Sequence, residues 1–429
     1  MTDLPAGLAA VIQRAEPLSR RFAEAGHRLY FVGGVVRDQL LARARDEQDL
    51  DATTDARPPQ IKALVADLAD AVWTQGERFG TIGCTVDGQI YEITTHRAEA
   101  YDPRSRKPTV SFGDRIGDDL ARRDFTVNAM AVDVADGTLV DPFGGRADLV
   151  AGVLRTPLDP EISFSEDPLR MLRAARFHAG YRLTPTAELE AAITALLDRM
   201  AIVSAERIRD ELQKLLLLDS PAEGFRLLAA TGLLAVVLPS LGATGDDEAV
   251  ARAARAASVA PDAGARWAAL LAPDGIDVAT LRELKFSGAL SRDVVWFASA
   301  VTWVDDPDVR AADAPSIRRL AAMVPGGRTV DELLDWVAAQ RAHLGRTTTD
   351  LEAFRAAHDT LRAAEPDLAD PSPLLSGESV CALLAIEPGP EVGVAMTWLR
   401  DLRLAEGPMD PALAADRLRQ WWETRADPA

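Results

Sequence analysis

The chain has 429 residues, a formal net charge of −19 and 48% hydrophobic residues. This length predicts two to four folded modules, and the acidic balance argues against a protein that coats nucleic acid by bulk electrostatic attraction. No apolar segment is long enough to span a bilayer, and the N-terminus lacks a signal-peptide pattern, so no membrane partner is expected. The two cysteines, Cys84 and Cys381, lie far apart and lack the spacing of a zinc site, which favours a reducing, cytoplasmic compartment.

The first part of the chain mixes strands and helices. Short strands are expected at Arg28–Val32 and Asp49–Thr53, with helices at Val35–Leu41 and Pro58–Leu68, the second of which begins at a proline pair. Two hairpins follow, in which paired alternating segments flank Asp-Gly: Thr81–Val86 with Gln89–Thr95, and Val132–Val134 with Thr138–Val140. The dipeptides Asp87-Gly88 and Asp136-Gly137 both favour type I′ turns, so we expect a small mixed sheet.

After about Ser163, alanine and leucine dominate and apolar residues recur at helical spacing. We therefore predict an α+β fold in which a small mixed-sheet module is followed by an almost wholly helical remainder. Proline- and glycine-containing breaks are expected within 239–245, 273–276, 307–315 and 366–373. The expected modules are residues 1–157, 158–240, 241–365 and 366–429.

The run from Phe31 to Asp38 predicts a strand, a turn at Gly33-Gly34 and the start of a helix that carries Arg37. Glycines leave backbone N–H groups open to close approach by a phosphate. Asp49 and Asp51 follow, and residues two apart on a strand share one face. Paired carboxylates are suitable ligands for Mg²⁺ acting on a phosphate, so the combination predicts nucleotidyl transfer. A solvated strand end is the alternative for the carboxylate pair alone.

A third carboxylate, Glu92, lies between apolar neighbours on an expected strand. If it shares a face with Asp49 and Asp51, it belongs to the same catalytic group. An outward-facing polar residue on an alternating strand is the competing interpretation.

A dense polar cluster follows at residues 122–129. Arg122 and Arg123 are suited to clamping phosphates, Asp124 to accepting a hydrogen bond from a ribose hydroxyl, and Asn128 to shaping the loop or contacting the sugar. A charged turn in which Asp124 caps a helix is the alternative.

Residues 166–176 place charged side chains at helical spacing. Asp167 and Arg170 would present an acceptor and a fork of donors side by side, a combination that can recognise the edge of a base. Arg173 and Arg176 would reach other atoms of the nucleotide, such as phosphates. The alternative is a helix start in which Ser163 and Glu166 form a capping box.

With these motifs in this order, the chain resembles the class II nucleotidyltransferases of the tRNA CCA-adding and bacterial poly(A) polymerase family. The resemblance rests on motifs within roughly residues 28–240, namely Gly33-Gly34-x-x-Arg37-Asp38, Asp49-x-Asp51, Arg122 to Ala129, Asp141 to Gly145, and Glu166-Asp167-x-x-Arg170. It implies a catalytic head (1–157), a neck for base recognition (158–240), a helical body (241–365) and a tRNA-binding tail (366–429).

The resemblance also implies the reaction. Mg²⁺ held by Asp49 and Asp51 would support transfer of C, C and A from CTP and ATP to the 3′ end of tRNA, whose acceptor arm would be the macromolecular partner. Gly34, Arg37 and one of Arg122 and Arg123 would contact the triphosphate, Asp167 and Arg170 the base, and Arg173 and Arg176 further parts of the nucleotide. The segment Asp141–Gly145 would be a hinge. The oligomeric state is left open.

The segment Arg97–Leu120 resembles a flexible loop of family members that add the final A, which favours full CCA addition. A partial enzyme that adds only CC or only A and a poly(A) polymerase are the closest alternatives. A silent RNA-binding module is disfavoured by the intact carboxylate pair, and a transferase acting on a small molecule is disfavoured by the long helical half.

Many bacterial relatives carry a phosphohydrolase module in the body, marked by a histidine–aspartate pair after an apolar helix. Here Arg266–Leu271 resembles that helix, but no histidine follows it. The pair His358-Asp359 comes too late in the chain, and we interpret it as a chance feature of a helix surface. We therefore expect a degenerate module without phosphatase activity.

Overall fold

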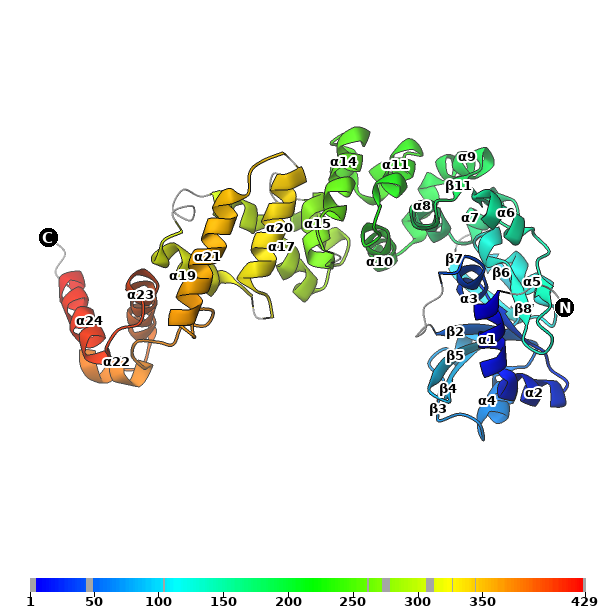
Figure 1. The fold of residues 1–429 in the computed structure, drawn as a ribbon, viewed down its shortest axis with the longest axis horizontal. Coiled ribbons are helices and arrows are strands. Elements are labelled where there is room, and N and C mark those ends of the chain that lie inside the picture. The colour runs from blue at the N-terminus through cyan, green and yellow to red at the C-terminus, as the bar shows by residue number, and fades with distance from the viewer. Residues whose placement is uncertain are drawn as a thin grey trace. The chain divides into compact units, whose positions relative to one another are not determined.

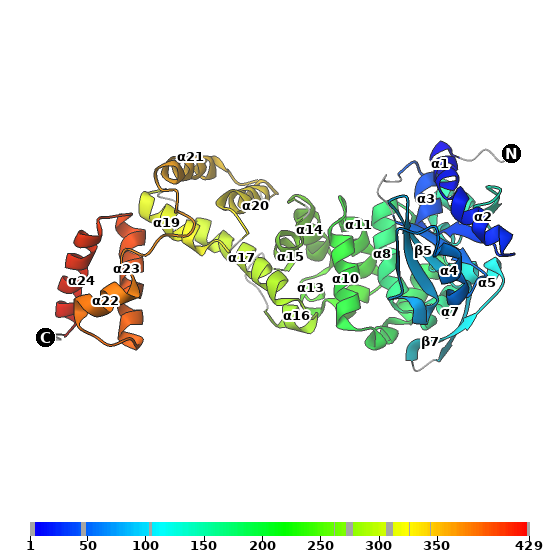
Figure 2. The same cartoon turned by 90° about the horizontal axis from the view of Figure 1, so that it is seen from below.

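The computed structural model describes residues 5–43, 49–102, 105–260, 262–271, 278–305, 312–325, 327–343 and 345–426. The chain forms two compact units that divide near residue 251, with 283–285 belonging to the first (Figures 1 and 2). The first unit contains a mixed sheet and helices, and the elements described in the second unit are all helices. The predicted α+β class with a largely helical remainder is confirmed. The finer division into four modules stays a prediction.

The central sheet has seven strands in the order β3-β4-β5-β2-β1-β8-β9. Its strands are β1 (Leu29–Val32), β2 (Leu50–Thr54), β3 (Ala71–Trp73), β4 (Thr81–Val86), β5 (Gln89–Thr95), β8 (Ala131–Asp133) and β9 (Leu139–Val140). The pair β2 and β5 is parallel, and every other neighbouring pair is antiparallel. The sheet is therefore mixed, and the parallel pair lies at its centre.

Four helices accompany these strands, namely α1 (Ala6–Arg14), α2 (Glu16–Glu24), α3 (Gly34–Leu40) and α4 (Pro58–Val65). Helix α4 packs against β4 and β5, and α2 packs against α4 and β1. On β5 the buried residues Tyr91 and Ile93 alternate with the exposed Ile90 and Glu92. One face of β5 is thus covered by protein, while the face that carries Glu92 is open.

The two predicted hairpins differ in their turns. Asp87 and Gly88 have φ angles of 49° and 74°, as a type I′ turn requires, and the strands on both sides end where predicted. The second hairpin pairs Ala131 with Val140, but of Asp136 and Gly137 only the glycine has a positive φ. Its prediction as a type I′ turn was wrong, because Gly137 N–H reaches back to the carbonyl of Asp133 and closes a longer loop.

The segment expected to be a flexible loop contains regular structure. Strands β6 (Arg97–Asp102) and β7 (Ser105–Phe112) form an antiparallel pair, and helix α5 (Ile116–Ala121) follows. Pro103 and Arg104 lie outside the described residues. The expectation of a loop over Arg97–Leu120 is corrected, because this pair forms its own two-stranded sheet.

Further elements of the first unit include short 3₁₀ turns, small helices and one more strand pair. They are η1 (Glu77–Phe79), η2 (Thr126–Asn128), α6 (Gly145–Ala151), β10 (Val153–Leu154), α7 (Pro160–Glu166), α8 (Leu169–Tyr181), β11 (Thr184–Pro185), α9 (Ala187–Ala195), η3 (Leu197–Ile202), α10 (Ala205–Leu216), α11 (Ala222–Ala230), α12 (Leu233–Val237) and α13 (Pro239–Gly242). Helix α8 is central here, because it packs against both α10 and α11. The break expected within 239–245 is partly helical, since Pro239 begins α13.

The capping box predicted at Ser163 and Glu166 was wrong. Ser163 lies inside α7, whose N-cap is Asp159, and Glu166 is the last residue of that helix. Helix α8 begins only at Leu169, whose N–H donates to Oδ1 of Asp167 at 3.3 Å. Asp167 therefore lies between two helices and closes the start of the second one.

Helix α14 (Asp246–Ala257) contains the division between the two units. The helices that follow are α15 (Ala263–Leu271), α16 (Val278–Glu283), α17 (Gly288–Asp305), α19 (Ala314–Met323), α20 (Val330–His343), α21 (Thr349–Ala364), α22 (Gly377–Leu384), α23 (Pro390–Glu406) and α24 (Pro411–Ala426). The break expected within 273–276 lies outside the described residues, as do residues 307–311 of the break expected within 307–315. The rest of that second break contains the start of α19 at Ala314. The break expected within 366–373 is confirmed, since α21 ends before it and α22 begins after it.

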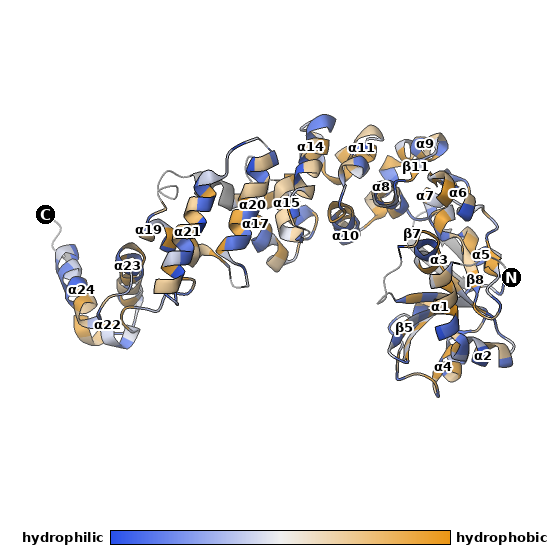
Figure 3. Cartoon of the chain, viewed as in Figure 1, coloured by the Kyte–Doolittle hydropathy of each residue, from blue (hydrophilic) through white to orange (hydrophobic). Residues whose placement is uncertain are grey.

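Helices of both units carry hydrophobic and hydrophilic sides (Figure 3). No helix in the described part of the chain is both long and apolar enough to cross a membrane. His358 is only 5% exposed, so its interpretation as a surface feature was wrong: it lies on the buried side of α21 with Leu351 and Phe354.

Candidate active site

The open face of the central sheet carries two carboxylates side by side. Parallel pairing of β2 with β5 places Asp51 directly opposite Glu92, and both side chains are exposed while their strand neighbours Leu50 and Tyr91 are buried. Glu92 therefore shares a face with Asp51, as the alternating pattern had suggested. Asp49 lies just before β2 and is also exposed.

The carboxylates influence one another electrostatically. The pKa of Asp51 is raised above its ordinary value. Partial desolvation by the surrounding protein is the main cause, the negative charges of Glu92 and Asp49 add to it, and the positive charge of Arg123 opposes it. Neighbouring carboxylates that disfavour each other's ionised form are stabilised by a cation placed between them. Within the described ranges, no group of three or more histidine, cysteine, aspartate or glutamate side chains is arranged to hold a metal by itself. The donor set instead suits a cation completed by substrate oxygens.

A sharp glycine turn connects β1 to α3. Gly33 has φ 65° and ψ −125°, a conformation that side chains rarely adopt, and Gly34 is the first residue of the helix. A Cβ built on Gly33 would lie 3.0 Å from Nη1 of Arg123. The turn thus needs glycine for both its backbone angle and its space, and the Arg123 guanidinium lies directly against it.

Asp119 holds both arginines of the polar cluster. This fully buried carboxylate on α5 accepts from Nε and Nη2 of Arg122 at 3.0 and 2.5 Å and from Nη2 of Arg123 at 3.0 Å. Burial would raise the pKa of Asp119, but the two guanidinium groups hold it well below its usual value. Asp119 is a residue that the sequence analysis missed; its position three and four residues before the arginines, one helical turn away, was the available signal.

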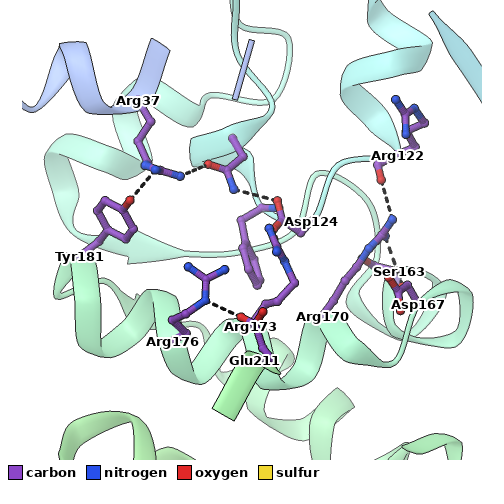
Figure 4. Close-up of polar contacts among 12 residues, drawn as sticks. Arg37, Arg122, Asp124, Ser163, Asp167, Arg170, Arg173, Arg176, Tyr181 and Glu211 are labelled. Carbon is purple, nitrogen blue, oxygen red and sulfur yellow. Dashed lines mark hydrogen bonds and ion pairs between the residues drawn. The ribbon is translucent and has the colours of Figure 1, made fainter. Parts of the chain in front are cut away.

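Arg37 is buried among protein partners. Its Nε and Nη2 donate to the carboxylate of Asp38 at 2.8 and 3.0 Å. Nη1 donates to Oδ1 of Asn128, and Nη2 also donates to the hydroxyl of Tyr181 (Figure 4). Only 8% of the Arg37 side chain is exposed. Most of its donors are therefore occupied, although contact with a triphosphate had been expected.

Asp124 is likewise enclosed. Its Oδ2 accepts from Nε of Arg173 at 2.8 Å, and its Oδ1 accepts from Nδ2 of Asn128 and from N–H of Phe125, both at 2.9 Å (Figure 4). Burial would raise the pKa of Asp124, but Arg173 and the Asn128 hydrogen bond lower it to about 2. Asp124 is not the N-cap of η2, which is Phe125. Both carboxylate oxygens are engaged, so in this arrangement Asp124 fixes the position of α8.

Arg170 lies where α8 meets the polar cluster. Its Nη1 donates to Oγ of Ser163 at 2.8 Å, and its Nη2 donates to the carbonyl of Arg122 at 2.6 Å (Figure 4). The residue is only 7% exposed. Asp167 is 25% exposed and pairs with Arg207 of α10 at 3.1 Å.

Arg176 pairs with the buried Glu211, which also belongs to α10. Sequence reasoning missed both α10 partners, Arg207 and Glu211, although their spacing of four residues places them on one helix face.

The segment expected to be a hinge lies at the start of α6. The carboxylate of Asp141 accepts hydrogen bonds from N–H of Gly145 and of Arg146, the first two residues of that helix.

Two family models match the chain. Residues 29–155 match the poly A polymerase head domain, and residues 182–244 match the probable RNA and SrmB-binding site of polymerase A. The first match contains the carboxylates, the glycine turn and the polar cluster. The two base-recognition candidates, Asp167 and Arg170, lie between the two matched regions.

Curated relatives include the CCA-adding enzymes of Lactobacillus johnsonii, 39% identical over 227 residues, and of Bacillus subtilis, 40% identical over 224 residues. These matches cover 53% and 52% of this chain and 55% of each relative. The chain therefore matches only about half the length of these proteins.

Solved structures match over nearly the whole chain. The CCA-adding enzyme of Bacillus stearothermophilus in complex with CTP has a TM-score of 0.76 and 27% identity, covering 96% of this chain and 99% of that one. The Thermotoga maritima CCA-adding enzyme complexed with tRNA has a TM-score of 0.59 at 19% identity, over 96% of each chain, and shows likeness of fold alone.

Proposed function

We propose that the chain is a nucleotidyltransferase of the kind represented by the CCA-adding enzymes and bacterial poly(A) polymerases, and that it adds C, C and A to the 3′ end of tRNA from CTP and ATP. The match of residues 29–155 to the poly A polymerase head domain and the similarity to CCA-adding enzymes support this proposal. One observation carries the proposal. Residues far apart in sequence meet at the central strands of the sheet: Asp51 lies beside Glu92, and Arg123 lies against the glycine turn that follows β1. Carboxylates beside a phosphate-accessible backbone turn are the groups that nucleotidyl transfer requires.

Asp49 and Asp51 are the proposed ligands of a divalent cation, for which we propose Mg²⁺. Proteins commonly bind this ion through one or two carboxylates together with phosphate oxygens of the substrate. Glu92 lies on the same face of the sheet as Asp51 and adds to the negative charge there. When bound, the cation would neutralise phosphate charge and make the attacking hydroxyl more acidic. The remaining work falls to the residues around it.

The glycine turn is proposed to bind the triphosphate through the backbone N–H groups of Gly33 and Gly34. Of the two arginines left open by the sequence, Arg123 is the better candidate to contact the phosphates, because its guanidinium lies at the turn. Arg122 instead supplies a carbonyl to Arg170. Arg37, Asp38, Asp124 and Asn128 are proposed to position this machinery through the hydrogen bonds that they make with one another and with α8.

Base selection is proposed to depend on Asp167 and Arg170, one an acceptor and the other a donor of hydrogen bonds. Arg170 donates a hydrogen bond to the backbone carbonyl of Arg122 in the polar cluster. This contact connects the proposed base-recognition residues to the proposed phosphate-binding residues. Arg173 and Arg176, first expected near the nucleotide, are paired with Asp124 and Glu211 and are proposed to hold α8 in place.

In the proposed reaction, the terminal ribose hydroxyl oxygen of tRNA attacks the α-phosphorus of the bound nucleotide. The hydroxyl proton passes to solvent, the new phosphodiester bond forms as the bond between the α-phosphorus and the bridging oxygen breaks, and pyrophosphate leaves with that electron pair. The protein contributes mainly by holding the reactants in line and by matching charge. We propose that the enzyme works in the cytoplasm; both cysteines are free, as a reducing compartment would keep them.

The deciding experiment uses three tRNA substrates that end at the discriminator base, at C and at CC. Each is incubated with Mg²⁺ and with CTP, ATP or both, and the products are separated at single-nucleotide resolution. Full CCA addition extends all three substrates to the same end. Extension that stops after CC, that requires a CC end, or that continues into a run of A would identify a CC-adding enzyme, an A-adding enzyme or a poly(A) polymerase.

A further inference from the structure

The C-terminal residue of α8, Tyr181, contacts the helix that follows the glycine turn. The Arg37 guanidinium lies 4.1 Å from the centroid of the Tyr181 ring, and its Nη2 donates to the tyrosine hydroxyl. Phe177, one turn earlier on α8, has its ring centroid 5.2 Å from the same guanidinium. A cation over aromatic rings and hydrogen-bonded at its edge is held in both direction and distance.

A second path joins α8 to Arg37. Nη1 of Arg37 donates to Asn128, Asn128 donates to Asp124, and Asp124 accepts from Arg173, which lies on α8 two turns before Tyr181 (Figure 4). The contacts therefore form a closed circuit that leaves α8 at Arg173 and returns to it at Tyr181. A closed circuit resists rotation of α8 about α3 better than either contact alone.

Tyr181 also lies near the segment that leaves α3. The guanidinium of Arg43 is 6.0 Å from the Tyr181 ring centroid, and its Nη1 donates to the carbonyl of Gly180 at 3.3 Å. Burial raises the pKa of Tyr181, so the phenol stays neutral at physiological pH and its oxygen can accept from Arg37. The end of α8 thus contacts α3 at Arg37 and just beyond its C-terminus.

We propose that Tyr181 is a positioning residue that sets the distance between the phosphate-binding turn and the base-recognition residues. This inference rests on the proposed function. Arg37 is one helical turn from Gly33 and Gly34, and Arg170 lies in the first turn of the helix that Tyr181 ends, so the contact fixes one site against the other. Without it, the turn loses its alignment with a triphosphate whose base is already engaged.

The test compares Tyr181→Leu and Tyr181→Phe with the control Tyr30→Phe, which removes a hydroxyl that accepts from Arg28 elsewhere in the sheet. Nucleotide KM and kcat are measured for CTP on tRNA ending at C and for ATP on tRNA ending at CC. We expect Tyr181→Leu to raise both KM values about tenfold, through loss of the ring contact and the hydrogen bond, with kcat changed less. Tyr181→Phe keeps the ring and should raise both KM values by a smaller factor, while the control leaves them unchanged.

An equal rise in KM for CTP and for ATP distinguishes a positioning role from a role in base selection. A positioning role acting through the triphosphate raises both KM values together and preserves the ratio of kcat/KM for CTP and ATP. The proposal is overturned if Tyr181→Leu leaves both KM values unchanged, or if it alters that ratio as much as Arg170→Ala does. Combining each Tyr181 variant with Arg37→Lys adds a second check, since effects that simply add would show that the two residues act independently.

Thermal melting and nucleotide binding by calorimetry distinguish failure of the Tyr181 proposal from misfolding of a variant and from failure of the proposed function. If Tyr181→Leu proves unfolded by thermal melting, Tyr181→Phe and the Arg37 double variant carry the test, because they keep most of the buried volume. If the wild type adds no nucleotide to any tRNA substrate, the proposed function fails. Binding of CTP and ATP by calorimetry without tRNA then still decides whether Tyr181 supports the triphosphate, with unchanged affinity in Tyr181→Phe and Tyr181→Leu overturning it.

Discussion

Both units bury arginines against carboxylates, but the two networks differ in what surrounds them. In the first unit, the network of Arg37, Asp124 and Arg173 includes the helix that follows the glycine turn, and the same unit carries the exposed carboxylates Asp51 and Glu92. In the second unit, Glu365 accepts from Arg318 and Arg403, and these groups are 6%, 7% and 2% exposed. They join α19, α21 and α23.

The difference teaches that a buried ion pair by itself does not identify an active site. The Glu365 network also contains Asp367, which accepts from Arg403 at 2.9 Å, and it lies beside a cavity of about 490 Å³ that Arg403, Met396 and Leu374 help to line. The carboxylates of this network are paired with guanidinium groups, whereas Asp51 and Glu92 are exposed on the open face of the sheet. We interpret the Glu365 network as a set of ion pairs that holds α19, α21 and α23 together. In the first unit, we propose that the same chemistry holds helix α8 in position beside the proposed site. The predictions below test this contrast.

The largest effect is expected from Asp51→Asn. Loss of one proposed cation ligand should reduce addition of both C and A more than about a thousandfold, because the neutral amide cannot balance the cation's charge. Asp87→Asn, which makes the same change in the exposed β4–β5 turn, is the matched control. Activity should be followed with truncated tRNA and stability by thermal melting; an active Asp51→Asn enzyme would contradict the assignment of the site.

Glu365→Ala should affect stability rather than chemistry. Removing this carboxylate takes away the acidic partner of the buried Arg318 and leaves Arg403 paired with Asp367 alone, which costs about 3–5 kcal/mol in the free energy of unfolding. Denaturant unfolding measures the loss, with Glu352→Ala on the exposed side of α21 as control. At a temperature where the variant stays folded, its nucleotide KM should match the wild type; a large KM change would place this network in the active site after all.

Asp124→Asn is expected to lose about 2 kcal/mol of stability at neutral pH, since the native pKa of about 2 lies below the ordinary 3.8. A lowered native pKa stabilises the fold above pH 3.8, and this contribution disappears as the pH falls towards 2. The gap between wild type and variant should therefore close over that range in denaturant unfolding. Asp118→Asn, an exposed neighbour on α5, controls for charge; a pH-independent gap would argue against the ion pair with Arg173.

The smallest change in rate is expected for Arg170→Ala, but this change should affect the choice between CTP and ATP specifically. The ratio of kcat/KM for CTP and ATP should shift by about tenfold, because a donor to the base edge is lost. Arg226→Ala, which removes an exposed arginine on α11, should leave the ratio unchanged. Competition between the two nucleotides on tRNA ending at CC measures the ratio directly, and an unchanged ratio would remove the role in base selection.

Local sequence determined most of the elements of the first unit. The strands on both sides of Asp87-Gly88 end where predicted, and the proline pair at residue 58 begins α4, because turn and helix-start signals act over a few residues. The signals that failed were short and ambiguous. Ser163 with Glu166 has the pattern of a capping box, yet α7 had already begun at Pro160 and the serine hydroxyl accepts from Arg170.

The sequence by itself established which residue types the site contains and their order along the chain: two neighbouring aspartates, a double glycine and a series of arginines. It could not show which arginine faces the glycine turn or that α10 supplies partners to α8. Those contacts join residues separated by tens of positions, and only packing of the strands and helices brings them within hydrogen-bonding distance. Tyr181 is the clearest case, because nothing near it in sequence indicates that Arg37, 144 positions earlier, lies over its ring.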